Sequence, residues 1–132
     1  RFISQACVGL VDQIEKGELQ SPATAALVDR YVMPLIAQGA DTLVLGCTHY
    51  PFARELIESA ARHAGCAAPV IIDTGEAVTR QLSRLLEAKA LVRGAGKEGN
   101  LLAYTTAGAS TLSTALVNLL KMDAEVRQIA TN

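Results

Sequence analysis

The sequence has few of the residues that hold small secreted or metal-bound domains together. It lacks Trp, is 4% aromatic, and has three cysteines at Cys7, Cys47 and Cys66. Three cysteines so far apart do not make a disulfide framework, and no CxxC pair suggests zinc. We therefore expect free thiols in a reducing compartment and no metal site.

An excess of charge of one sign is also lacking. The chain has 12 Lys and Arg against 13 Asp and Glu, a formal net charge of -1. Such a balance creates no field that would gather nucleic acid or an anionic membrane, so neither partner is expected. The longest apolar run, near residues 40–47, is far shorter than the roughly 20 residues that cross a bilayer, and no charged-then-apolar leader precedes it. We expect a soluble protein of the cytoplasm.

Apolar material, by contrast, is plentiful. Half of the 132 residues are hydrophobic, which is enough for the core of one ordinary domain and argues against a disordered chain. The chain begins at Arg1 without an initiator Met, and an amphipathic stretch starts almost at once. We interpret this as a truncated start.

Hydrophobic periodicity predicts alternating helices and strands. Ser21 followed by Pro22 is typical of a helix start, and Pro34 inside that helix should kink it or split it in two. Residues 42–46 form an apolar run without polar alternation, which predicts a parallel strand buried on both faces. The predicted helices are residues 3–16, 22–38, 51–64, 75–88 and 110–120, and the predicted strands are residues 42–46, 70–73, 101–105 and 126–129.

This order of elements predicts the fold class. Strands alternating with helices of ten or more residues indicate βαβ units and a parallel sheet, an α/β fold. In the helix at 75–88 we expect Val78, Leu82 and Leu85 to point inward, and the Gly-rich charged segment 93–100 should be a loop. Reactive groups in such folds lie in loops at the carboxyl ends of strands, which is where Cys47 falls.

Cys47 therefore stands out among the three cysteines. It follows a predicted buried strand and precedes a helix that Pro51 opens, so its sulfur would lie near unpaired backbone N–H groups and the positive end of a helix dipole. Both effects favour a thiolate. His49, two residues on, can hold a proton close to that sulfur or to a substrate. The competing interpretation is a small buried hydrophobic residue, the usual role of a free cysteine.

The run Leu-Gly-Cys-Thr-His-Tyr-Pro at residues 45–51 closely resembles the second-cysteine signature of glutamate racemases, which are cofactor-independent enzymes. The resemblance extends over nearly the whole chain. Residues 11–17 are similar to a family segment that ends in Glu-Glu-Gly, so Glu15 matches an acidic residue near the active site, while Lys16 replaces the second Glu. Further similar segments are residues 31–35, 40–45, 72–78 and 104–108.

The resemblance implies an architecture of two similar α/β domains with the active site between them. By this alignment the chain is the C-terminal half. Residues 1–73 form part of the domain that bears the second catalytic cysteine, and residues 74–132 form a C-terminal segment that packs with the N-terminal domain. The family's other cysteine lies in its first half and has no counterpart here. We expect the isolated chain to be inactive and to expose apolar surface. The resemblance is also compatible with a homodimer of the full-length protein.

The implied reaction interconverts L-glutamate and D-glutamate for peptidoglycan synthesis and for cell wall and cell shape. Inverting an α-carbon requires a base on one face and an acid on the other, and thiols, with an ordinary pKa of about 8.5, suit both roles. Cys47 would be one of the two, His49 would tune or assist it, and Glu15 would support the arrangement. Thr48 and His49 would line the substrate pocket.

Other residues receive structural interpretations. Cys7, in the predicted helix at 3–16, and Cys66 are interpreted as core residues, and His63 as a solvated residue near a helix C-terminus. Asp73 is predicted to cap the helix that follows it. The glycines at 94, 96 and 99 do not make a phosphate loop, because no strand leads into them and no GK[ST] follows.

Three alternative functions stay open. Another superfamily member, such as an aspartate racemase, a hydantoin racemase or a decarboxylase, would use the same cysteine-bearing turn, but these relatives usually lack the His-Tyr-Pro continuation at residues 49–51. A cysteine hydrolase or transferase would use Cys47 as nucleophile and His49 as base. A non-enzymatic binding module is the third, and the charge balance does not favour it.

Overall fold

The computed structural model describes residues 1–94 and 99–130 and divides into two compact units, Arg1–Asp73 and Thr74–Asn132. Each unit contains helices and one pair of parallel strands, so the predicted α/β class and the parallel pairing are confirmed. The assignment of residues 1–73 and 74–132 to parts of two racemase domains stays a prediction. In the described residues, no helix has both the length and the apolar character needed to span a membrane.

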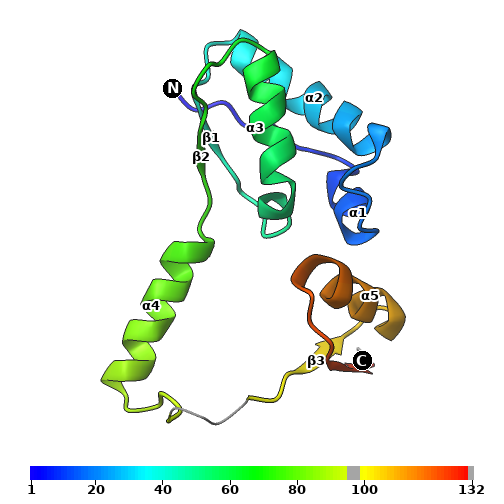
Figure 1. The fold of residues 1–132 in the computed structure, drawn as a ribbon, viewed down its shortest axis with the longest axis vertical. Helices are drawn as coiled ribbons and strands as arrows, with labels where there is room; N and C mark the ends of the chain where they lie inside the picture. The colour runs from blue at the N-terminus through cyan, green and yellow to red at the C-terminus, as the bar shows by residue number, and fades with distance from the viewer. Residues whose placement is uncertain (95–98, 131–132) are drawn as a thin grey trace. The chain divides into compact units, whose positions relative to one another are not determined.

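Unit 1 packs three helices and a 3₁₀ turn with a two-stranded sheet. The strands β1 (Thr42–Val44) and β2 (Val70–Ile72) run parallel, with Leu43 opposite Ile71, and α3 lies between this sheet and α2 in Figure 1. The remaining elements are α1 (Leu10–Glu15), α2 (Pro22–Ala37), η1 (Tyr50–Ala53) and α3 (Arg54–His63). Parallel pairing brings the carboxyl ends of both strands to one edge, from which the chain enters η1.

The start of α2 follows from its capping residues. Ser21 is the N-cap, and its hydroxyl accepts a hydrogen bond from the Thr24 backbone N–H at 3.2 Å. Thr24 is fully buried and donates its own hydroxyl to the Glu18 carbonyl at 2.7 Å. The helix runs unbroken through Pro34, so the predicted split does not occur. It ends before Gly39, whose φ of +86° lies in the left-handed region.

The hydrophobic core of unit 1 joins its three helices to one face of the sheet. Buried alanines let α2 and α3 approach closely, because a methyl group takes little space between helix axes. The core residues are Leu10, Ile14, Val28, Val32, Leu43, Leu45, Ala53, Ile57, Ala60, Ala61 and Ile71. Both β1 and β2 alternate exposed, buried, exposed.

Two predictions for unit 1 were wrong in detail. The first helix begins at Leu10 rather than residue 3, because Gly9 has a φ of +82° and cannot continue an α-helix on its N-terminal side. Cys7 therefore precedes the helix. The strand predicted at 42–46 ends at Val44 and is buried on one face only, since Leu43 is buried and Val44 is 59% exposed.

Unit 2 contains a second parallel pair and two helices. The strands β3 (Leu102–Thr105) and β4 (Glu125–Gln128) pair through the crossover helix α5 (Ala109–Leu120), and Leu116 of α5 is buried. These elements confirm the predicted helix at 110–120 and, within one residue at each end, the predicted strands. Residues 93, 94, 99 and 100 have no regular secondary structure, whereas residues 95–98 of the predicted loop, including Gly96, lie outside the described residues.

The helix α4 (Gly75–Ala88) has the predicted bounds but not the predicted burial. No residue of α4 is buried, and Val78, Leu82 and Leu85 are all exposed. The prediction that they point inward was wrong, because a helical spacing of apolar residues defines a stripe on the helix without providing a surface to cover it.

Candidate active site

Cys47 lies in a tight turn at the carboxyl end of β1. The turn begins where the Leu45 N–H donates to the Ile72 carbonyl of β2 at 2.8 Å, and it closes where the Tyr50 N–H donates to the Cys47 carbonyl at 3.2 Å. Pro51 then occupies the first turn of η1, where its missing N–H costs nothing. Cys47 is half-buried and its thiol is free. It lies between β1 and the helical turn η1, as predicted.

The imidazole of His49 lies between Cys47 and Glu15. Its Nδ1 atom is 3.7 Å from Cys47 Sγ, and its Nε2 atom is 3.1 Å from Glu15 Oε1. Cys47 and His49 share one turn, whereas Glu15 is the last residue of α1 and comes from a distant part of the sequence. Sulfur, imidazole and carboxylate thus form a continuous polar chain from the surface of α1 to the end of β1. Such a chain can move or hold a proton at the sulfur.

Thr48 sits between Cys47 and His49 and is exposed. Its side chain is therefore accessible to a small molecule that approaches the turn, while the described structure gives it no partner in the Cys47–His49–Glu15 chain. Of the four predicted site residues, Cys47 and Glu15 each contact His49, and Thr48 lies in the same turn as Cys47 and His49.

Cys7 lies next to this site, which the sequence analysis did not anticipate. Burial raises the pKa of its thiol, the Tyr50 hydroxyl beside it acts in the opposite direction, and the neighbouring Cys47 raises it further. Burial and the same Cys7 side chain raise the pKa of Tyr50 to about 12. Both groups therefore stay protonated at neutral pH. Tyr50 was visible in the motif, but nothing in the sequence signalled its proximity to Cys7.

The remaining candidates have mixed outcomes. His63 is exposed in the last turn of α3, as predicted. Cys7 and Cys66 are half-buried rather than core residues. The N-cap position of α4 is Thr74 rather than Asp73, and the Asp73 carboxylate accepts a hydrogen bond from Arg54 at 2.9 Å. Within residues 1–94 and 99–130, no group of three or more His, Cys, Asp or Glu side chains is arranged to hold a metal ion.

Comparison with known proteins identifies homologues of this chain. The chain is 45% identical over 132 residues to a glutamate racemase of Pseudomonas putida, with 98% of this chain and 47% of that protein covered. It is 52% identical over 103 residues to the glutamate racemase of Herpetosiphon aurantiacus, with 76% and 38% covered. This chain is a homologue of the glutamate racemases. No family model matches it.

Solved structures of glutamate racemases have the same fold. The enzyme of Thermus thermophilus, in complex with beta-chloro-D-alanine, superimposes with a TM-score of 0.76 at 24% identity, covering 96% of this chain and 46% of the other. A glutamate racemase of Bacillus anthracis gives 0.76 at 25% identity with the same coverage. The racemase homologue thus spans about half the length of the relatives it matches.

Proposed function

We propose that this racemase homologue supplies one wall of a glutamate racemase active site, with Cys47 as one of two thiol acid/bases. The observation that supports the proposal most directly is the Glu15–His49–Cys47 chain at the carboxyl end of β1. We infer the substrate from homology, because a relative that aligns with 98% of this chain is a glutamate racemase. One of the structural relatives, from Francisella tularensis, is a complex with D-glutamate.

In the proposed mechanism the Cys47 thiolate removes the α-proton of glutamate from one face. A second thiol on the opposite face delivers a proton, which inverts the configuration, and the roles reverse for the other enantiomer. In the neutral tautomer of His49 with hydrogen on Nε2, this N–H donates a hydrogen bond to the Glu15 carboxylate. The lone pair of Nδ1 then faces Cys47 Sγ and takes up the thiol proton. Thr48, exposed in the same turn, would hold the substrate through its hydroxyl or backbone N–H.

The second thiol, in this proposal, comes from polypeptide outside the chain. Cys7 is a poor candidate, because it lies beside Tyr50 and Cys47, on the same wall as Cys47, whereas the mechanism requires a thiol on the opposite face of the substrate. The matched relatives are about twice as long as this chain, so their remaining length has room for the opposite wall. Residues 1–73 would then belong to the domain with the second catalytic cysteine, and residues 74–132 would pack with the other domain. No cofactor is required, and the enzyme would act in the cytoplasm in peptidoglycan synthesis, with a homodimer as one possible assembly.

The test is exchange of the glutamate α-hydrogen for solvent deuterium, followed by NMR. We expect exchange and racemisation from the complete racemase polypeptide that contains this chain, none from the 132-residue chain alone, and none from Cys47→Ser in the complete polypeptide. L-aspartate should be a poor substrate. Exchange catalysed by the isolated chain would contradict the two-thiol mechanism, and a preference for aspartate would move the assignment to a different racemase of the superfamily.

A cysteine hydrolase or transferase is a second candidate, because sulfur, imidazole and carboxylate occur here in the order of a nucleophile, its base and the residue that orients the base. In that reaction Cys47 Sγ would attack a carbonyl, and the leaving group would depart with the proton from His49. Such a site also requires donors for the oxyanion. Incubation with activated esters, followed by intact-mass measurement, separates the two functions: a stable acyl group on Cys47 supports the hydrolase, and its absence together with α-hydrogen exchange supports the racemase.

A further inference from the structure

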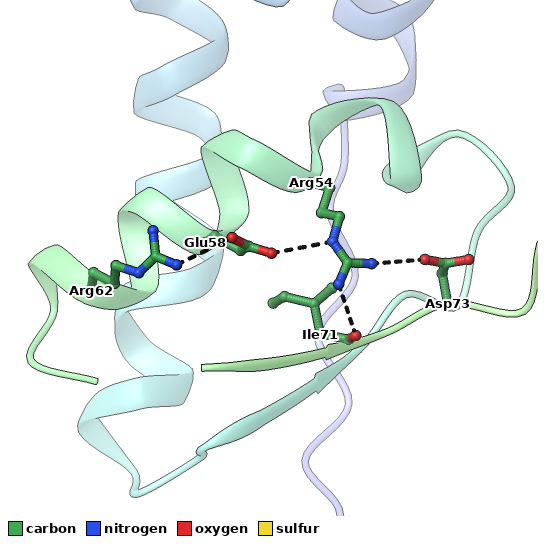
Figure 2. A network of polar contacts seen from close by, with 5 residues as sticks. All are labelled: Arg54, Glu58, Arg62, Ile71 and Asp73. Carbon is green, nitrogen blue, oxygen red and sulfur yellow. Dashed lines mark hydrogen bonds and ion pairs between the residues drawn. The ribbon is translucent and has the colours of Figure 1, made fainter. Parts of the chain in front are cut away.

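Arg54, the first residue of α3, links the start of that helix to the end of β2, beside the Cys47 turn, defined here as residues 45–53 (Figure 2). Its Nη1 atom donates to Asp73 Oδ2 at 2.9 Å, and its Nη2 atom donates to the Ile71 carbonyl at 3.3 Å. Its Nε atom donates to Glu58 Oε1 at 3.1 Å. All three nitrogens of one guanidinium group are therefore engaged, and a planar fork of donors makes this geometry possible.

The contacts of Arg54 attach the end of the Cys47 turn to the strand that already holds its beginning. At the beginning, the Leu45 N–H donates to the Ile72 carbonyl at 2.8 Å. At the end, Arg54 reaches Ile71 and Asp73, the neighbours of Ile72 on either side. The turn that carries Cys47 and His49 is thus attached at both ends to three consecutive residues, the last two of β2 and the residue that follows the strand.

Helix stability alone does not explain a cation at this position. An arginine in the first turn of a helix faces the positive end of the helix dipole, which disfavours it. Arg54 is compensated by two carboxylates, Asp73 and Glu58, whose side chains are only 20% and 26% exposed. Glu58 also accepts a hydrogen bond from Arg62 through its other oxygen, at 3.3 Å (Figure 2). These ion pairs indicate that Arg54 contributes a contact between α3 and the end of β2 and does not stabilise the helix start itself.

We propose that Arg54 is a positioning residue for Cys47, one that fixes the closing end of the Cys47 turn on β2 and so maintains the Cys47–His49 contact. Asp73 is the last residue of unit 1, so the same ion pair also fixes the point at which the chain leaves that unit. Arg54 itself touches no reacting group. The effect on turnover rests on the proposed racemase function, whereas the effect on the turn does not.

The experiment compares Arg54→Gln with Arg62→Gln in the full chain. Arg62 is the matched control, because it lies on the same helix and pairs with the same Glu58 but does not contact β2. Amide hydrogen exchange measures the turn through the Tyr50 and Phe52 N–H groups, which donate to the Cys47 and His49 carbonyls. Alkylation of Cys47 by iodoacetamide, resolved by peptide mass spectrometry across pH 6 to 9, measures the Cys47–His49 contact.

For Arg54→Gln we expect exchange at these amides to rise about tenfold, the change that loss of one hydrogen bond to a charged group produces. The pH profile of Cys47 alkylation should shift in the same direction as in His49→Gln. Arg62→Gln should leave both measurements at wild-type values. In the racemase assay of the complete polypeptide that contains this chain, kcat should fall more than KM rises, because a misplaced acid/base stabilises the transition state less well.

Equal exchange and equal alkylation profiles in Arg54→Gln and Arg62→Gln would overturn the proposal. If Arg54→Gln does not fold, as judged by circular dichroism, Arg54→Lys is compared with Arg62→Lys. A lysine keeps the charge but cannot reach three partners, so it should give faster exchange in the turn, and identical exchange in the two lysine variants would again overturn the proposal. If the complete wild-type polypeptide that contains this chain shows no racemisation, the proposed function fails, while the exchange and alkylation results still decide the role of Arg54.

Discussion

Replacing Glu15 by Gln tests whether the carboxylate acts on Cys47 through His49. Gln has the same shape and retains an oxygen that accepts a hydrogen bond, so the substitution removes the charge with little change in packing. The Glu15 Oε1 to His49 Nε2 distance is 3.1 Å, and the two side chains are 42% and 32% exposed. Glu15 is the last residue of α1 and contacts the imidazole that lies beside the sulfur, so the substitution changes the partner of His49 and leaves the Cys47 turn itself intact.

The magnitude follows from the distance and the exposure. Two unit charges 3.1 Å apart attract by about 1 kcal/mol in a water-like dielectric, and exposed pairs usually give about 0.2 to 1 kcal/mol after screening. We therefore expect a coupling free energy of about 0.5 to 1 kcal/mol between Glu15 and His49. By the same arithmetic, Glu15→Gln should slow Cys47 alkylation at neutral pH by about two- to fivefold.

A double-mutant cycle measures this coupling. The free energy of unfolding in urea is determined for wild type, Glu15→Gln, His49→Gln and the double variant, and Cys47 alkylation is measured on the same four proteins. Glu18→Gln is the control, because it removes an exposed carboxylate just beyond the end of α1. A coupling indistinguishable from zero, with alkylation of Cys47 equal in Glu15→Gln and Glu18→Gln, would refute the idea that Glu15 orients His49.

Two further predictions concern Gly9 and Cys7. Gly9→Ala should lower the free energy of unfolding by about 1 kcal/mol, because the φ of +82° at this position suits glycine. Gly9→Asn should lower it less, since asparagine tolerates this conformation better than alanine. Chemical denaturation measures both values, and equal values for the two variants would show that backbone strain is not the cause. Because the pKa of Cys7 is raised by folding, its contribution to stability is present below the ordinary thiol pKa and is lost as the pH rises through the raised value. Urea unfolding between pH 7 and pH 10 should show this fall, and Cys7→Ser should reduce it; an unchanged slope in Cys7→Ser would assign the fall to other groups.

The Cys47 turn was predictable because it depends on neighbouring residues. An apolar run followed by Cys-Thr-His-Tyr and then Pro51 specifies a strand, a turn and a helix start within ten residues. Side chains at positions i and i+2 of such a turn are close whatever the rest of the fold does. The Cys47–His49 contact at 3.7 Å is therefore a local property of the sequence.

The other half of the site is not local. Glu15 and His49 are 34 residues apart, and the Arg54–Asp73 pair spans 19 residues. No periodicity relates such positions, because their approach depends on how α1, α3 and β2 pack. Only the resemblance to glutamate racemases singled out Glu15. For Arg54 the sequence offered one signal, the i,i+4 spacing to Glu58, which indicates an ion pair on a helix face but not a bridge to a strand.

The errors in the fold have a related cause. Periodicity located α4 correctly and placed Val78, Leu82 and Leu85 on one stripe, yet these residues are exposed. The apolar run of β1 likewise predicted burial on two faces, and only Leu43 of that strand is buried. A hydrophobic pattern states which surface needs a partner, and the partner can belong to another part of the chain or to another polypeptide. The predicted start of α1 was wrong for a different reason, the left-handed backbone conformation of Gly9.

The distribution of the core explains why the candidate site residues lie on unit 1. Of the described residues that form the buried hydrophobic core, every one but Leu116 belongs to unit 1. Leu10 and Ile14 fix α1, which ends in Glu15, and Ala53 and Ile57 fix the segment that follows the Cys47 turn. Groups that exchange a proton must be held to a fraction of an ångström, and only well-packed elements supply such constraint. The side chains that form the core of unit 1 therefore also hold Cys47, His49 and Glu15 in contact. A substitution that loosens this core should disturb the geometry of the candidate site as well.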